Sequence, residues 1–312
     1  MHTFSHLVNA ILVIVLLYIV AIILRKKEIL KEDHSLILAK VVTDLFLPAM
    51  IFTTLAARTI DPKMLTPAFE MLGLEILMIV LAWVISVLLK FNRAQQGAIV
   101  FCSAFGSSTF LGYPLIMQMF PDQPEALTEA VLISEIGVGY PIFIIGPVLA
   151  SYFGSKESDK KALVKSSLSF VKSPVFFALI AGVLWSSFGL PTTENVITAP
   201  VFKMGTMLSD ALTPMAILTV GLMFKLPSLK NILLPLVIVI ALKLILKPVL
   251  GSCFASITNV QDLWRDVVII LAAMPPAILG VVFLKRYGGD ASLASALLLA
   301  ASIISIATIV GV

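Results

Sequence analysis

Long apolar segments constrain this chain more than any other feature of its sequence. Cutting the chain at charged and Pro/Gly-rich breaks gives ten such segments, and each is about the 20 residues that a helix needs to cross a bilayer. Only 13% of the residues are charged, against roughly a quarter in a soluble domain. The sequence therefore predicts an all-α membrane protein with ten transmembrane helices, at approximately 6–24, 36–57, 68–89, 97–119, 127–152, 174–190, 201–224, 232–254, 267–284 and 291–312.

The positive charges predict how these segments are oriented. Fifteen of the 22 Lys and Arg residues fall in the loops after segments 1, 3, 5, 7 and 9, and four fall on the other side. Cytoplasmic loops are the ones enriched in Lys and Arg. We therefore expect a multi-pass protein of the plasma (cell inner) membrane with both termini outside the cytoplasm. The cations Arg25, Lys26 and Lys27 follow the first segment, which argues for a retained span rather than a cleaved signal.

Two short motifs occur twice at nearly the same offset. Residues 44–50 (DLFLPAM) align with 210–216 (DALTPMA), and residues 112–122 (GYPLIMQMFPD) align with 280–290 (GVVFLKRYGGD). Each half holds five spans, an odd number, so the second copy must enter the membrane inverted. The predicted organisation is a first five-helix repeat at 1–152, a cytoplasmic linker at 153–173 and a second, inverted repeat at 174–312.

The fourth and ninth segments carry glycine and proline in mid-span. Proline removes a backbone donor and clashes with the preceding turn, so both segments are predicted to unwind. Unwound backbone at this depth is tolerated where it is buried in protein or lines a wet cavity, and the new helix N-termini would favour an anion. Ordinary proline kinks and small-residue packing are the alternative. The candidate substrate-binding residues here are Gly106, Ser107, Ser108, Thr109, Gly112, Tyr113, Pro114, Met274, Pro275, Pro276 and Ala277.

Several predicted spans contain ionisable residues, which are costly there and usually functional. Lys243 and Lys247 lie one turn apart in the eighth segment. We favour Lys243 as a substrate-binding residue, because a buried ammonium group needs an anion, here Glu135 or the substrate. Lys247 has the alternative of reaching an interface with its long side chain. Glu135 and Glu75 are the candidates for coupling, because desolvation can keep a buried carboxyl group protonated.

Other chemistries lack support in the sequence. The three histidines lie at or beyond span ends, and there is no HExxH, GxGxxG, Walker or G-x-S-x-G motif. Cys102 and Cys253 fall in separate apolar segments, which argues against a disulfide framework or a CxxC metal site. The basic residues are spread over loops rather than gathered on one face. We therefore predict no enzyme activity, metal site, cofactor or nucleic-acid partner.

Four stretches carry a family resemblance: residues 47–52 (LPAMIF), 106–114 (GSSTFLGYP), 243–248 (KLILKP), and 274–276 (MPP) with 285–290 (KRYGGD). With them the chain resembles the auxin efflux carrier family, which includes plant PIN-type carriers and bacterial malate/malonate permeases. The resemblance implies an inverted 5+5 repeat with crossed broken helices 4 and 9, as in bile-acid sodium symporters and NhaA-like folds. It also implies elevator-type alternating access, with scaffold helices 1, 2, 6 and 7 and a transport domain of helices 3–5 and 8–10. A homodimer through the scaffold helices and contact with membrane lipid are further expectations.

The chain departs from this family pattern at both breaks. Many relatives have an Asn where this chain has Ser107, Ser108 and Thr109, and the ninth segment lacks the acidic sodium ligand of the bile-acid symporters. Direct sodium coupling is therefore not expected, and proton coupling or facilitated diffusion is favoured. The predicted function is secondary active transport of small organic anions, carboxylates such as malate, malonate or auxin-like acids. A cation/proton antiporter of related fold and a carboxylate sensor that does not transport are the alternatives.

Overall fold

The computed structural model describes residues 2–31, 33–154, 164–165, 168, 170–222 and 232–310. Within these residues the regular structure is helical, apart from one isolated backbone bridge, so the prediction of an all-α fold is confirmed for the described part. Most of the predicted linker 153–173, including Lys156, Lys160 and Lys161, lies outside the described residues.

Seven helices of the described part are long and apolar enough to cross a membrane, against ten predicted. Of the other three predicted spans, the fourth and the ninth are each interrupted. The shorter helices on the two sides of each interruption are not long enough to cross a membrane alone. The sixth is the shorter helix α11 (Pro174–Ser187). Ten spans and the inverted repeat stay predictions. The seven helices are Asn9–Lys26, His34–Ala56, Pro62–Leu88, Pro124–Phe153, Ala199–Leu222, Leu233–Ile257 and Ala291–Ile309.

The chain divides into two compact units, and each takes segments from both halves of the sequence. The first unit combines Met1–Met64, Thr109–Val131 and Val171–Phe224. Helix α11 packs closely on α3, where a Cβ at Gly182 would lie 2.9 Å from Leu55 Cβ. The helices of this unit are α1 (His2–Lys26), α2 (His34–Val41), α3 (Leu47–Ala56), α6 (Tyr113–Met119), α7 (Pro124–Leu132), α11 and α12 (Ala199–Leu222).

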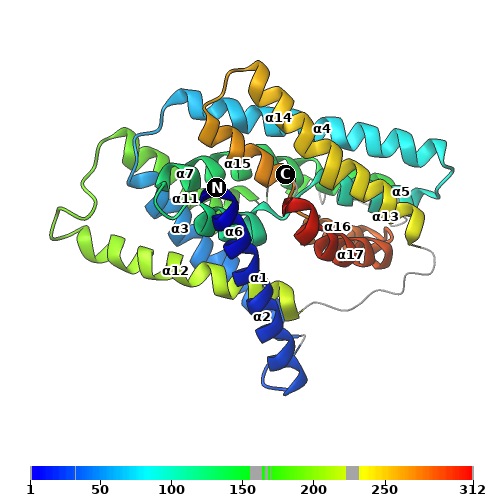
Figure 1. Cartoon of the computed structure of the whole chain (residues 1–312), viewed down its shortest axis with the longest axis horizontal. Coiled ribbons are helices and arrows are strands. Elements are labelled where there is room, and N and C mark those ends of the chain that lie inside the picture. Colours follow the sequence, from blue (N-terminus) through cyan, green and yellow to red (C-terminus); the bar gives the residue numbers. More distant parts are fainter. Residues whose placement is uncertain are drawn as a thin grey trace. The chain divides into compact units, whose positions relative to one another are not determined.

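The second unit combines Leu65–Ser108, Leu132–Phe170 and Lys225–Val312. The long helix α4 (Leu65–Leu88) packs against α5, α14 and α15, and Figure 1 shows α14 and α15 (orange) beside it. Its other helices are α5 (Arg93–Ala104), α8 (Tyr140–Ile144), α9 (Gly146–Phe153), α13 (Leu233–Val239), α14 (Lys247–Ile257), α15 (Asp262–Ala272), α16 (Ile278–Tyr287) and α17 (Ala291–Val310). The division into scaffold and transport helices stays a prediction.

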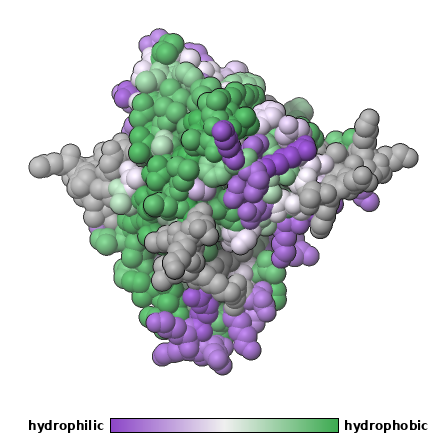
Figure 2. All heavy atoms as spheres, turned by 90° about the vertical axis from the view of Figure 1, so that its right-hand side faces the viewer, coloured by the Kyte–Doolittle hydropathy of each residue, from purple (hydrophilic) through white to green (hydrophobic). Residues whose placement is uncertain are grey.

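The outer faces of the long helices are apolar. On α4, Ile76, Val80, Val84 and Val87 recur at helical spacing and are 47%, 48%, 50% and 49% exposed. The face of the molecule in Figure 2 carries broad areas of apolar atoms (green). Such a surface would be costly in water but is suited to lipid tails, since the bilayer core has no water. The described helices are therefore those of a multi-pass membrane protein.

In the described part of the chain, four helices contain a π-helical segment, and each segment is followed two residues later by a proline. Proline cannot donate to the preceding turn and clashes with the carbonyl four residues back, and one extra residue in the turn relieves both problems. Pro114 therefore does not unwind the helix around it, which continues from Ser108 to Met119. The four pairs are Val42–Phe46 with Pro48, Ser108–Gly112 with Pro114, Ile133–Gly139 with Pro141, and Ile240–Leu246 with Pro248.

Candidate functional site

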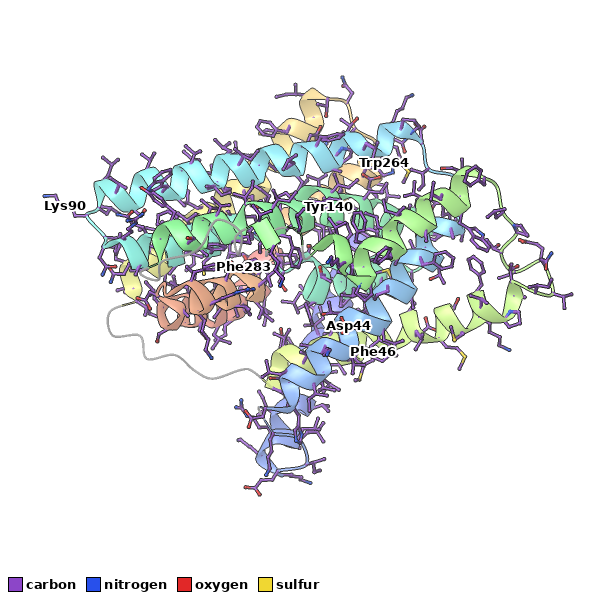
Figure 3. The ribbon with its side chains drawn as sticks, turned by 180° about the vertical axis from the view of Figure 1, so that it is seen from behind. Asp44, Phe46, Lys90, Tyr140, Trp264 and Phe283 are labelled. Atoms are coloured by element: carbon purple, nitrogen blue, oxygen red, sulfur yellow. The ribbon has the colours of Figure 1, made fainter. Side chains whose placement is uncertain are left out.

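Two interrupted helices meet inside the second unit. Helix α5 ends at Ala104, and Phe105 continues in extended conformation with φ −80° and ψ 128°. Helix α15 ends at Ala272, and the chain becomes helical again only at Ile278, the first residue of α16. Figure 3 labels Trp264 on α15 and Phe283 on α16, which mark the two half-helices. The predicted unwinding is therefore observed at 273–277, whereas in the fourth segment it covers only 105–107.

The two breaks are joined by backbone hydrogen bonds. Gly106 and Pro276 form an isolated antiparallel bridge. Its bonds run from Ser107 N to Pro275 O, 2.7 Å, and from Ala277 N to Phe105 O, 2.9 Å. Buried backbone groups must find partners, and here the crossing segments satisfy each other. The broken segments are thus held together as one two-stranded crossing.

The sequence explains why α15 stops where it does. In a continuous helix, the amides of residues 275 and 276 would donate to the carbonyls of Leu271 and Ala272. Both positions are proline, so neither amide exists. Each proline also disfavours the helical region for the residue before it. The helix therefore ends, and the Ala272 carbonyl needs another donor.

That donor is Lys243. Its Nζ atom donates to Ala272 O at 3.2 Å, and its side chain is fully buried. A Cβ added at Gly106 would lie 2.8 Å from this Nζ, so the ammonium group lies directly over the bridge. Gly106 has no side chain, and this leaves room at the crossing for the buried lysine that we predicted there.

The alternative for Lys247 was that its side chain reaches an interface. It does not, because Lys247 is fully buried too. Its Nζ donates to Glu75 Oε1 at 2.6 Å and to the last carbonyl of α5, Ala104 O, at 2.8 Å. Such a pair is tolerated in the interior because charge and hydrogen bonds compensate the lost hydration. The buried ion pair thus joins Lys247 to Glu75, whereas we expected Glu135 as a partner for Lys243.

Glu135 lies in the π-helical segment Ile133–Gly139 and is 4% exposed. Its carboxylate lies against its own helix, since a Cβ at Gly139 would be 3.2 Å from Oε2. Tyr140, which directly follows this π-helical segment and is labelled in Figure 3, is the first residue of α8. Glu135 is therefore a buried acid of the second unit, and its coupling role stays a prediction.

The second half-helix after the break has an open N-terminus. Ala277 precedes α16 in extended conformation, and no side chain caps the helix. The first amides of a helix carry partial positive charge and have no partner within it. On the other broken segment, Ser107 and Ser108 are buried. Thr109 is half-buried, and Gly112, Tyr113 and Pro114 belong to the helix that follows, with Tyr113 fully buried.

One buried acid was missed by our reading of the sequence. Glu129 in α7 is fully buried in the first unit. It stands near the start of the predicted fifth span, where a carboxylate is ordinarily wet. Its position one turn after the exposed Glu125 gave no signal of burial, because the two residues lie on the same face of α7 and differ only in how far along the helix they stand.

Comparison with known proteins gives the family. A family model described as "Membrane transport protein" matches residues 6–311. The chain is 24% identical over 293 residues to an uncharacterized transporter of Methanocaldococcus jannaschii, covering 91% of each chain. It is 25% identical over 274 residues to a protein of Rhizobium meliloti named "Putative malonate transporter", covering 86% of this chain and 82% of that one. The protein therefore belongs to the membrane transport protein family, the auxin efflux carrier family that its motifs resemble.

Proposed function

We propose that this protein is a secondary active transporter of small organic anions, with dicarboxylates of the malonate and malate type as the first candidates. The observation that carries the proposal is the hydrogen-bonded crossing of two helix breaks, with the fully buried ammonium group of Lys243 over it. Secondary transporters of several folds bind substrate at such discontinuous helices.

The chemistry at the crossing suits an anion. The α16 N-terminus has no side-chain cap, so its first amides can donate to a carboxylate. Ser107 and Ser108 supply hydroxyl donors on the other broken segment. A malonate-type substrate also agrees with the name of the Rhizobium meliloti relative.

The proposed cycle is elevator-type alternating access. Helices 3–5 and 8–10, which hold the crossing, would carry the substrate, and helices 1, 2, 6 and 7 would form the scaffold. The two compact units follow this division except at Thr109–Val131, which belongs to helices 4 and 5 but lies in the first unit. Glu135 and Glu75 are the proposed coupling acids. Glu75 would have to leave Lys247 to take up a proton.

Uptake by proteoliposomes tests the proposal. The purified protein is reconstituted, and uptake of labelled malonate, malate and indole acetate is followed under an imposed proton gradient and, separately, a sodium gradient. We expect saturable uptake of at least one carboxylate and no stimulation by sodium. Protein-free liposomes serve as the control.

Two outcomes would favour the alternatives instead. Movement of an inorganic cation with no uptake of any carboxylate would indicate a cation/proton antiporter. Saturable carboxylate binding without counterflow of labelled substrate would indicate a sensor. Either result would contradict the proposed transport function.

A further inference from the structure

The C-terminal ends of both broken helices in the second unit are occupied by lysine side chains. Helix α5 ends at Ala104, whose carbonyl accepts from Lys247 Nζ at 2.8 Å. Helix α15 ends at Ala272, whose carbonyl accepts from Lys243 Nζ at 3.2 Å. Both lysines come from one continuous helical stretch and are fully buried.

These carbonyls need a positive partner for two reasons. Each is the last of its helix, where the aligned peptide dipoles leave partial negative charge. Each also lacks the amide that a continuous helix would supply, and the bilayer core offers no water in its place. An ammonium group answers both needs, because it is a cation with three donors.

The ligands around Lys247 are those that an alkali cation would use. Its Nζ lies 2.6 Å from the Glu75 carboxylate and 2.8 Å from a backbone carbonyl. The second carboxylate oxygen, Glu75 Oε2, is buried without a hydrogen-bond partner. In transporters with broken helices, carbonyls at half-helix C-termini are typical ligands of a coupling sodium ion or proton.

We propose that Lys247 is a resident cation, which holds with its ammonium group the position where a coupling metal ion would otherwise bind. In a transporter of the function proposed above, on which this inference rests, it makes sodium unnecessary. No metal ion then has to enter or leave this position during the cycle. Removing Lys247 converts its oxygen ligands into a sodium site.

The test is the thermal unfolding of the purified full chain in sodium chloride, with choline chloride keeping the ionic strength constant. We expect the wild-type melting temperature to be the same in both salts. Lys247→Ala lowers it in choline, and sodium raises it again saturably, by about 3 °C or more, because the ion takes the place of the ammonium group. Lys247→Ala combined with Glu75→Gln shows no sodium effect, because the carboxylate ligand is gone. Lys203→Ala, at an exposed site on α12, behaves as the wild type.

A sodium-specific rise for the wild type would overturn the inference, and so would a Lys247→Ala protein that melts alike in both salts. A sodium response that survives Glu75→Gln would equally contradict the assigned ligands. If Lys247→Ala does not fold in either salt, Lys247→Ser is measured instead, because its small side chain leaves the same oxygen ligands free, and the wild-type comparison remains decisive. Because melting requires no substrate, a failure to transport anions and a failure of this inference are separate results.

Discussion

At the scale of single residues, the crossing depends on small and charged side chains that fit one another. Gly106 leaves space for the Lys243 ammonium group, and Lys243 supplies the donor that Pro276 withholds from Ala272. Each residue type is explained by its neighbour. A substitution at Gly106 should therefore act through its effect on Lys243.

Gly106→Ala tests this dependence. The new methyl group would lie 2.8 Å from Lys243 Nζ, so this atom has to shift, and we expect its hydrogen bond to Ala272 O to be weakened or lost. We expect uptake to fall at least about tenfold and the melting temperature to drop by a few degrees, as for a lost hydrogen bond to a charged group. Gly73→Ala in α4 is the matched control, since a Cβ there meets nothing within 4 Å.

The double variant Gly106→Ala with Lys243→Ala separates the clash from other effects. Because Lys243→Ala removes the group that the methyl contacts, the two losses of stability should not add. Strictly additive losses would contradict the contact between the two side chains.

At the scale of elements, proline acts differently according to its number and setting. A proline at the second position after a π-helical turn, as at Pro114 and Pro248, is absorbed without a break. Pro214 lies inside α12, which has neither a π-helical turn nor a break at this proline. Two consecutive prolines, Pro275 and Pro276, remove adjacent donors and end α15.

Pro276→Ala restores one of those donors. The new amide can bond to Ala272 O and compete with Lys243, so α15 should extend into the break. We expect the new amide at residue 276 to be protected from hydrogen exchange, greater protection at residues 277 and 278, and a loss of uptake of about tenfold or more. Pro174→Ala is the control, because Pro174 is the first residue of α11, where an amide would have no helical partner anyway. An unprotected amide at residue 276, with unchanged exchange at residues 277 and 278, would show that proline does not hold the break open.

At the scale of the whole molecule, orientation in the membrane is set by charge in the loops. Fifteen of the 22 Lys and Arg residues lie on the side predicted to be cytoplasmic. Lys90, exposed where the chain turns from α4 into α5 and labelled in Figure 3, belongs to that side. Glu194, exposed in the loop between α11 and α12, belongs to the other.

Cysteine labelling tests this orientation. In a background with Cys102→Ala and Cys253→Ala, which removes both free cysteines, single variants Lys90→Cys and Glu194→Cys are exposed to a membrane-impermeant maleimide. In intact cells we expect strong labelling of Glu194→Cys and little of Lys90→Cys, because Lys- and Arg-rich loops stay inside. After permeabilisation both should label equally, which is the control. Labelling of Lys90→Cys in intact cells would reverse the predicted orientation.

The sequence by itself determined the features that depend on local composition. Apolar length predicts a helical membrane protein, and Pro275-Pro276 predicts a broken helix, because both follow from backbone hydrogen bonding within a short segment. Lys243 was predicted to be functional because a charge in mid-span is costly wherever it lies.

Only the tertiary structure decided which distant residues meet. The break at 105–107 contains no proline, and it exists because Phe105 and Ser107 bond to the opposing segment. Glu75 pairs with Lys247 across 172 residues of sequence, a choice among several buried acids that spacing cannot make. The residue type does not reveal the role of the Ala104 and Ala272 carbonyls, since every residue has a backbone carbonyl. Their role depends on where helices end and on which lysine reaches them, and both are set by packing.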